Sequence, residues 1–204
     1  QGCGLIAVID GASRQVMRYI PIGNTANLSP HDVEISGDGN FAYVPFYNGR
    51  LVQKIDVRTD TVVGSVDVGS VALGGTGLWS IVSLSPLDTS FMVSGTIGNG
   101  CLVQVNTNSM QINPRKSIDQ LTGGTSGFPS PHGLAYNATY DTFYATLLTN
   151  IVKYAFNSAG VLTFTKFISA TGNPHQIEMT PDHSKYFVTC PDPTSSAAST
   201  VRVY

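Results

Sequence analysis

Three histidines with the same local setting are the residues of this sequence best suited to act together chemically. His31, His132 and His175 each follow a proline and open a short, mostly apolar stretch, as in SPHDVEIS and NPHQIEMT. Imidazole binds copper, zinc and iron, and it exchanges protons near neutral pH. The equal placement predicts that the fold directs the three side chains toward one place, at one end of a central channel.

Two glutamates lie close to these histidines in the sequence. Glu34 and Glu178 follow His31 and His175 by three positions. Side chains three positions apart on a strand point to opposite faces, so each Glu is predicted to point away from its His. No G-x-S-x-G nucleophile motif is present. We therefore assign no catalytic residue and favour a non-enzymatic function.

Three interpretations of the repeated Pro-His pair stay open. In the first, His31, His132 and His175 bind a metal ion, namely copper, zinc or calcium, in a redox or hydrolytic enzyme. In the second, each imidazole donates a hydrogen bond to a backbone carbonyl of the neighbouring unit, and no cofactor is expected. In the third, the same side chains bind a ligand without metal. The repeated position alone does not separate these interpretations.

The surrounding sequence repeats with a period in the forties. Segments 5–23 (LIAVIDGASRQVMRYIPIG) and 51–69 (LVQKIDVRTDTVVGSVDVG) align without a gap at an offset of 46 residues. The Pro-His positions and Trp79, which takes the place of the histidine in one unit, are separated by 48, 53 and 43 residues. Such a period, made of short strands and turns, indicates β-propeller blades of four strands. Because Trp79 intervenes, His31 and His132 are not expected to be neighbours around the ring.

The best-preserved unit allows its four strands to be placed. They are predicted at 31–36, 41–46, 51–57 and 62–68, separated by turns rich in Gly, Asp and Asn. The predicted fold class is an all-β propeller of four-stranded antiparallel blades, with about four to five blades present as part of a larger ring. The expected single domain, 1–204, consists of a part-blade at 3–23, blades at about 29–69, 77–118 and 130–168, and a part-blade at 173–204.

The two part-blades are not expected to combine into one blade, since together they contain the third strand twice. We therefore predict an arc in which 5–10 does not pair with 200–204. The unpaired strand edges would be available to another chain or to the missing part of the ring.

On these residues the chain resembles the YVTN-repeat β-propeller family. The degenerate motif stands in AYVPF (42–46), FMVSG (91–95), FYATL (143–147) and YFVTC (186–190), and the associated Ile-Asp strand in LIAVID and LVQKID. The resemblance implies a propeller fold and an extracytoplasmic location, in the periplasm, at the cell surface or secreted. It does not specify a function, because propellers host many activities.

A weaker resemblance is to the propeller of nitrous-oxide reductase, which carries a copper cluster on histidines. Pro131-His132-Gly133 matches its Pro-His-Gly strand openings. The chain lacks the adjacent histidine pair of that enzyme and any counterpart of its cupredoxin domain. The resemblance therefore supports the metal interpretation only in part.

Composition narrows the classes of partner. The 204 residues carry a net charge of −2 and only 11 Lys and Arg, which form no basic stripe for nucleic acid. The sequence contains no run of about 18 apolar residues, so it predicts no membrane-spanning helix. The Gly-rich loops at 71–79 and 121–129 lead into first strands and carry the aromatic residues Trp79 and Phe128, which we expect to contribute with the histidines to a surface for a protein partner or small ligand.

The odd number of cysteines leaves at least one of them unpaired within the chain. Cys3, Cys101 and Cys190 fit no zinc or redox motif, and we interpret them as buried thiols, with one disulfide as the alternative.

Overall fold

The computed structural model describes residues 4–22, 29–46, 51–68, 79–85, 90–95, 102–118, 131–137, 139–147, 150–170, 172–192 and 199–204. Phe128, Cys3 and Cys101 lie outside these ranges. All regular elements in the described part of the chain are β-strands, so it contains no helix that could span a membrane.

The described residues form five antiparallel sheets that follow one another along the chain, and each is built from consecutive strands. The first has two strands, β1 (Leu5–Ile9) and β2 (Val16–Pro21). The second contains β3 (Glu34–Ile35), β4 (Phe41–Pro45), β5 (Leu51–Asp56) and β6 (Thr61–Asp67), and the third β7 (Trp79–Ser85), β8 (Ser90–Gly95), β9 (Leu102–Asn106) and β10 (Ile112–Ile118). The fourth contains β11 (Leu134–Tyr136), β12 (Thr142–Thr146), β13 (Asn150–Phe156) and β14 (Leu162–Ser169), and the fifth β15 (Ile177–Met179), β16 (Tyr186–Cys190) and β17 (Thr200–Val203).

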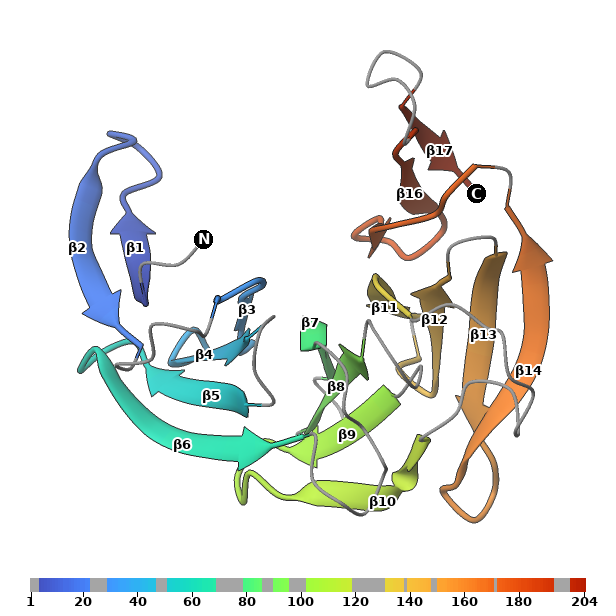
Figure 1. The fold of residues 1–204 in the computed structure, drawn as a ribbon, viewed down its shortest axis with the longest axis horizontal. Helices are drawn as coiled ribbons and strands as arrows, with labels where there is room; N and C mark the ends of the chain where they lie inside the picture. Colours follow the sequence, from blue (N-terminus) through green and yellow to red (C-terminus); the bar gives the residue numbers. More distant parts are fainter. Residues whose placement is uncertain are drawn as a thin grey trace.

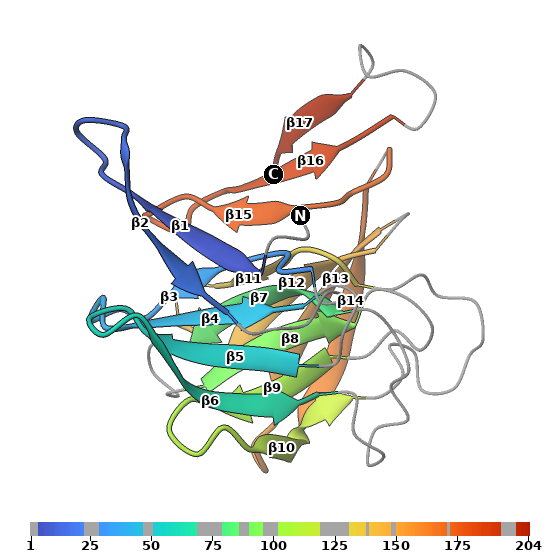
Figure 2. The ribbon, with the colours of Figure 1, turned by 60° about the vertical axis from the view of Figure 1, so that its left-hand side comes forward.

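The sheets form an arc around a common centre, with β6, β10 and β14 on the outside (Figure 1). At the centre β3 contacts β7, β7 contacts β11, and β11 contacts β15. Figures 1 and 2 show β1–β2 and β16–β17 on either side of the open part of the arc. No strand pairing between described residues joins β1 to β17. The predicted fold class is confirmed: this is a β-propeller of four-stranded antiparallel blades.

One turn geometry recurs between the third and fourth strands of successive sheets. Asp10 accepts a hydrogen bond from the backbone of Ser13, and Asp56 and Asn106 cap the equivalent turns. The residue four positions after each of these has a left-handed backbone; these are Arg14 (φ 57°), Asp60 (φ 57°) and Met110 (φ 51°). Gly160 (φ 71°) takes the corresponding place in the fourth sheet. The sequence repeat is therefore a repeat of backbone conformation.

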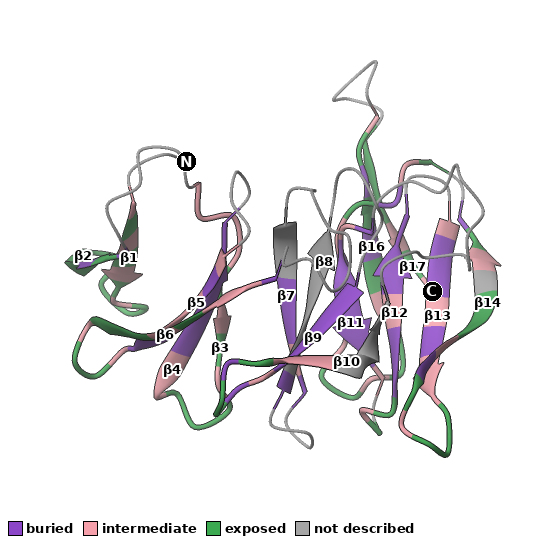
Figure 3. Cartoon of the chain, turned by 60° about the horizontal axis from the view of Figure 1, so that its bottom comes forward, coloured by how far each residue is buried: buried purple, intermediate pink, exposed green. Residues whose placement is uncertain are grey.

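The hydrophobic core lies between successive sheets. Ile20 of β2 packs with Val44 of β4, Val52 of β5 with Val103 of β9, and so on around the arc. Between the fourth and fifth sheets Tyr144, Tyr186 and Tyr204 stack, with ring centroids 5.3 and 5.2 Å apart. In Figure 3 the buried residues gather on strands such as β4, β9 and β13, whereas β1 and β2 are mostly exposed or half-buried. Each sheet is therefore stabilised by its neighbours.

In the second, fourth and fifth sheets the first strand begins later than predicted. Strand β3 starts at Glu34, not at His31, and β11 and β15 likewise start two residues after their histidines. The physical reason is that the segment after the histidine bonds elsewhere: Gly133 donates its backbone N–H to His175 O of the next sheet, at 2.9 Å. The histidines therefore lie just before the innermost strands in the sequence.

Candidate functional site

Each of the three histidines is anchored through its backbone. Its N–H donates to a carbonyl at the end of the second strand of its own sheet; the acceptors of His31, His132 and His175 are Pro45, Thr146 and Thr189, at 3.1, 3.0 and 2.8 Å. This backbone hydrogen bond is the structural feature that the three Pro-His pairs share. It sets the three Cα positions at the same level of the propeller.

The three side chains meet as one group, which we call the histidine cluster (His31, His132 and His175). The ring centroids of His132 and His175 lie 3.6 Å apart at an interplanar angle of 34°, and those of His31 and His132 lie 5.6 Å apart at 74°. Although the third sheet stands between their own sheets in ring order, His31 and His132 touch across the centre. The fold thus brings together all three predicted histidines.

Close approach of the fourth and fifth sheets depends on Gly133. A Cβ at this position would lie 2.6 Å from Ile177 N and 2.8 Å from His175 O. The Gly133 N–H also lies 2.8 Å from Thr146 Oγ1, and that hydroxyl donates to His175 O. The glycine after His132 is therefore required by packing, and it holds two members of the histidine cluster in contact.

The surroundings favour the neutral form of two of these imidazoles. Burial, followed by the charges of His175 and His31, lowers the pKa of His132 to about 4, and a hydrogen bond to the backbone of His175 opposes the shift. Partial burial and then the charge of His31 lower the pKa of His175. At neutral pH both rings are thus uncharged, and each has one donor and one acceptor nitrogen.

Carboxylates approach the same central region. Asp32 accepts a hydrogen bond from Val82 N of β7 at 3.0 Å, which ties the second sheet to the third. Burial raises the pKa of Asp32, and the charge of His31 opposes this rise. Burial, then repulsion by Asp32 and by Glu178 of β15, raises the pKa of Glu34 to about 7. No repeated pattern singled out Asp32 in the sequence, because the other Pro-His pairs are followed by Gly and Gln.

The histidine cluster does not fit a metal ion as it stands. A metal lies in the plane of each imidazole that binds it, about 2 Å from the nitrogen. The rings of His132 and His175 are stacked too closely and too nearly parallel for one ion to meet this condition for both. Within the part of the chain that the structure describes, no group of three His, Cys, Asp or Glu is arranged to hold a metal.

Of the two predicted aromatic residues, Trp79 is the first residue of β7, whereas the histidines precede their strands by two or three residues. Phe128 lies outside the described residues. His175 also lines an open cavity of about 380 Å³ together with Thr189, Ser199 and Val201. A surface with room for a ligand therefore adjoins the histidine cluster.

Comparisons with known proteins address the fold. No protein-family model and no curated protein sequence matches the chain. Among solved structures it is similar to a hydrazine synthase of Kuenenia stuttgartiensis (TM-score 0.71, 18% identity, covering 98% of this chain and 56% of that one). It is also similar to the periplasmic gluconolactonase PpgL of Pseudomonas aeruginosa (TM-score 0.65, 12% identity, covering 98% of this chain and 65% of that one).

A third similar structure is the β-propeller domain of Cps50 (Swd1) from Myceliophteria thermophila (TM-score 0.64, 12% identity, covering 88% of this chain and 54% of that one). The chain spans less than two thirds of the length of each of these three proteins. At these low identities the similarity concerns architecture, and what it shows is a β-propeller fold.

Proposed function

We propose that this chain is an extracytoplasmic binding module of the YVTN-repeat type, which holds a protein partner or small ligand on the face that carries the histidine cluster. The observation that carries the proposal is the contact among His31, His132 and His175, which come from three different sheets. Trp79 and Phe128 would add aromatic contacts on the same face.

Several features support this proposal. The four degenerate YVTN segments fall on the second strands β4, β8, β12 and β16. Neutral imidazoles offer directed donors and acceptors without the desolvation cost of a charge. The cavity beside His175 provides space for a ligand. For the location, the similar gluconolactonase is described as periplasmic.

The test is identification of the partner followed by reconstitution. The immobilised chain is incubated with an extracytoplasmic extract, the retained species is identified, and its affinity for the purified chain is measured. The double variant His31→Ala/His132→Ala should lose about tenfold or more in affinity. His183→Ala, in the turn after β15, is the matched control and should bind normally. Equal affinity of the double variant would contradict the proposal, and so would saturable turnover of a small substrate.

A second candidate function is a hydrolytic or redox enzyme that uses the histidines, with or without copper, zinc or calcium. It is favoured by Glu34, since a carboxyl with a pKa of about 7 suits a general base. Glucono-1,5-lactone is a first substrate to test, because one similar fold is a gluconolactonase. Lactone hydrolysis that is lost in Glu34→Gln, or stoichiometric metal found by elemental analysis of the native protein, would establish this alternative.

We also propose that further propeller strands, from another chain or from the rest of a ring, cover the two ends of the arc. Met17 and Tyr19 of β2 are 61% and 59% exposed, and Val201 and Val203 of β17 are 63% and 54% exposed. Large apolar side chains on strands usually pack against another sheet. The proposed single domain, with part-blades at 3–23 and 173–204, is thus one portion of that ring.

A further inference from the structure

A cavity of about 220 Å³ lies beside the fifth sheet, next to the cavity that His175 lines; the two share Cys190, Pro191 and Thr200. Its wall combines Gly172 and Pro191 with five side chains that carry polar or sulfur atoms, namely Asn173, Cys190, Asp192, Thr200 and Arg202. By volume it corresponds to about seven water molecules, enough for a small metabolite. None of these residues was predicted to bind a ligand.

The register of the fifth sheet explains why these side chains meet. Cys190 of β16 pairs with Thr200 of β17, and Val188 pairs with Arg202, so all four side chains share one face. Val188 and Cys190 belong to the core shared with the fourth sheet, and the cavity lies at the edge of that core, lined by residues of the fifth sheet and of the segment before it.

Gly172 leaves the cavity open above the cysteine. Its φ of +93° suits glycine, and a Cβ there would lie 3.2 Å from Cys190 Cβ and 3.7 Å from Sγ. Any other residue at this position would strain the backbone and fill the space over the thiol. Cys190 itself is a buried free thiol. A ligand in the cavity should therefore reduce the access of reagents to the Cys190 thiol.

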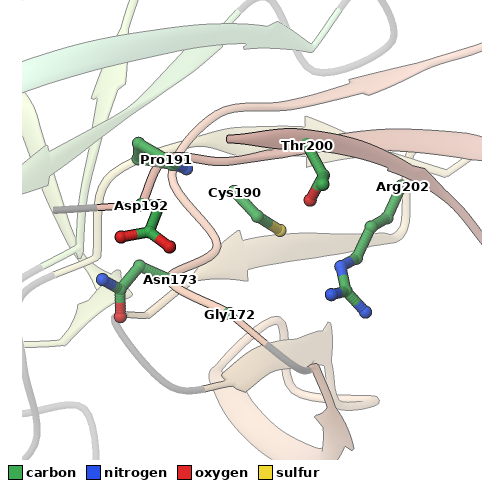
Figure 4. A pocket seen from close by; sticks show the side chains of 7 residues that line it. All are labelled: Gly172, Asn173, Cys190, Pro191, Asp192, Thr200 and Arg202. Atoms are coloured by element: carbon green, nitrogen blue, oxygen red, sulfur yellow. The ribbon is translucent and has the colours of Figure 1, made fainter. Parts of the chain in front are cut away.

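Opposite charges stand at the two sides of the cavity. In Figure 4 the guanidinium of Arg202 lies on one side, while Asp192 lies beside Asn173 on the other, with Cys190 and Thr200 between them. Arg202 and Asp192 each have another interaction within the protein. A guanidinium carries five N–H donors and a carboxylate accepts about four hydrogen bonds, so each retains capacity for a ligand.

We propose that this cavity binds a small zwitterion, with its carboxylate on Arg202 and Thr200 and its ammonium group on Asp192 and Asn173. A carboxylate is the natural partner of a guanidinium, and a nearby hydroxyl adds a second donor. An ammonium group supplies three donors to the carboxylate and amide oxygens at the other side. A ligand with both groups interacts with both walls, whereas a ligand with only one of them interacts with one wall and is held by fewer contacts.

The experiment is a calorimetric titration of the full chain with ω-amino acids of increasing length, glycine, β-alanine, 4-aminobutyrate and 6-aminohexanoate. At least one should bind saturably, and the matching monocarboxylate or monoamine should bind about tenfold or more weakly. In a background of Cys3→Ser and Cys101→Ser, that ligand should also slow alkylation of Cys190 by N-ethylmaleimide. Absence of both binding heat and protection across the series would overturn the proposal.

Two variants and a control assign the contacts. Arg202→Gln should weaken zwitterion binding by about ten- to a hundredfold, whereas Arg14→Gln, in an exposed turn, should not change it. Asp192→Asn should remove the preference for the zwitterion over the monocarboxylate, which a loss of folding would not do. Binding that survives Arg202→Gln, or selectivity that survives Asp192→Asn, would refute the assignment. The titration uses small zwitterions and the test of the histidine cluster uses its retained partner, so failure of one proposal can be told from failure of the other.

Discussion

At the scale of single residues, Gly133 shows how a backbone contact sets the histidine cluster. Gly133→Ala places a methyl group against Ile177 N and His175 O, which are backbone atoms that cannot rotate away. We expect a loss of about 1–3 kcal/mol in the free energy of unfolding, measured by urea denaturation. Gly37→Ala is the control, because a Cβ at Gly37 meets no atom within 4 Å. Equal stability of the two variants would contradict the role of Gly133.

The pKa of His132 predicts sensitivity to acid. Its folded value of about 4 is below the ordinary value of 6.5, so the unfolded chain binds a proton first as the pH falls. The contribution of His132 to stability is therefore complete above pH 6.5 and is lost progressively toward pH 4. The unfolding free energy should fall less steeply over this interval in His132→Gln. A slope that the substitution leaves unchanged would rule out His132 as the cause.

The ionisation of Glu34 changes stability with pH in the opposite direction from that of His132. Its folded pKa of about 7 is above the ordinary value of 4.5, so the unfolded chain ionises first, and native stability declines as the pH rises from 4.5 to 7. Glu34→Gln should therefore stabilise the protein at pH 8 relative to the parent chain, and this gain should vanish near pH 4. Denaturation of both proteins at the two pH values provides the measurement. A gain that is the same at both would point to packing and not to ionisation.

At the scale of elements, the recurrent turn between third and fourth strands stores backbone strain at Arg14, whose φ is 57°. Glycine adopts this conformation without a Cβ clash, so Arg14→Gly should raise the unfolding free energy by about 0.5–1 kcal/mol. Ala12→Gly in the same turn has no positive φ to relieve and should not stabilise. Thermal unfolding of both variants checks this, and a destabilised Arg14→Gly would show that the strain is absent.

Much of the fold could be predicted because strand and turn periodicity is carried by every unit. The placement of β4, β5 and β6 followed from the repeat, whereas the late start of β3 did not, since it depends on hydrogen bonds between separate strands. The repeated Pro-His pair also predicted that the histidines point to one place. The ring stacking of His132 on His175 and the Arg202 cavity depend on contacts between residues that follow no repeat, so no pattern in the sequence indicated them.

At the scale of the whole molecule, the exposed apolar end faces predict self-association. Met17 and Tyr19 lie together on β2 and are both well exposed. Light scattering should show the mean mass rising with protein concentration, and Met17→Glu/Tyr19→Ser should reduce that rise. Val161→Glu, an apolar-to-charged change in the turn before β14, should not. A mass independent of concentration in the parent chain would contradict the expectation.

The consecutive order of strands within every sheet has a consequence for how the chain reaches its structure. Among the described residues, no sheet takes a strand from a distant part of the chain, so a nascent polypeptide can complete each sheet as soon as its residues have been synthesised. The three four-stranded sheets are equivalent starting points, and ordering can then spread to either neighbour through the apolar layers between sheets. Folding can accordingly proceed from each sheet to its neighbour, without pairing strands that are distant in the sequence.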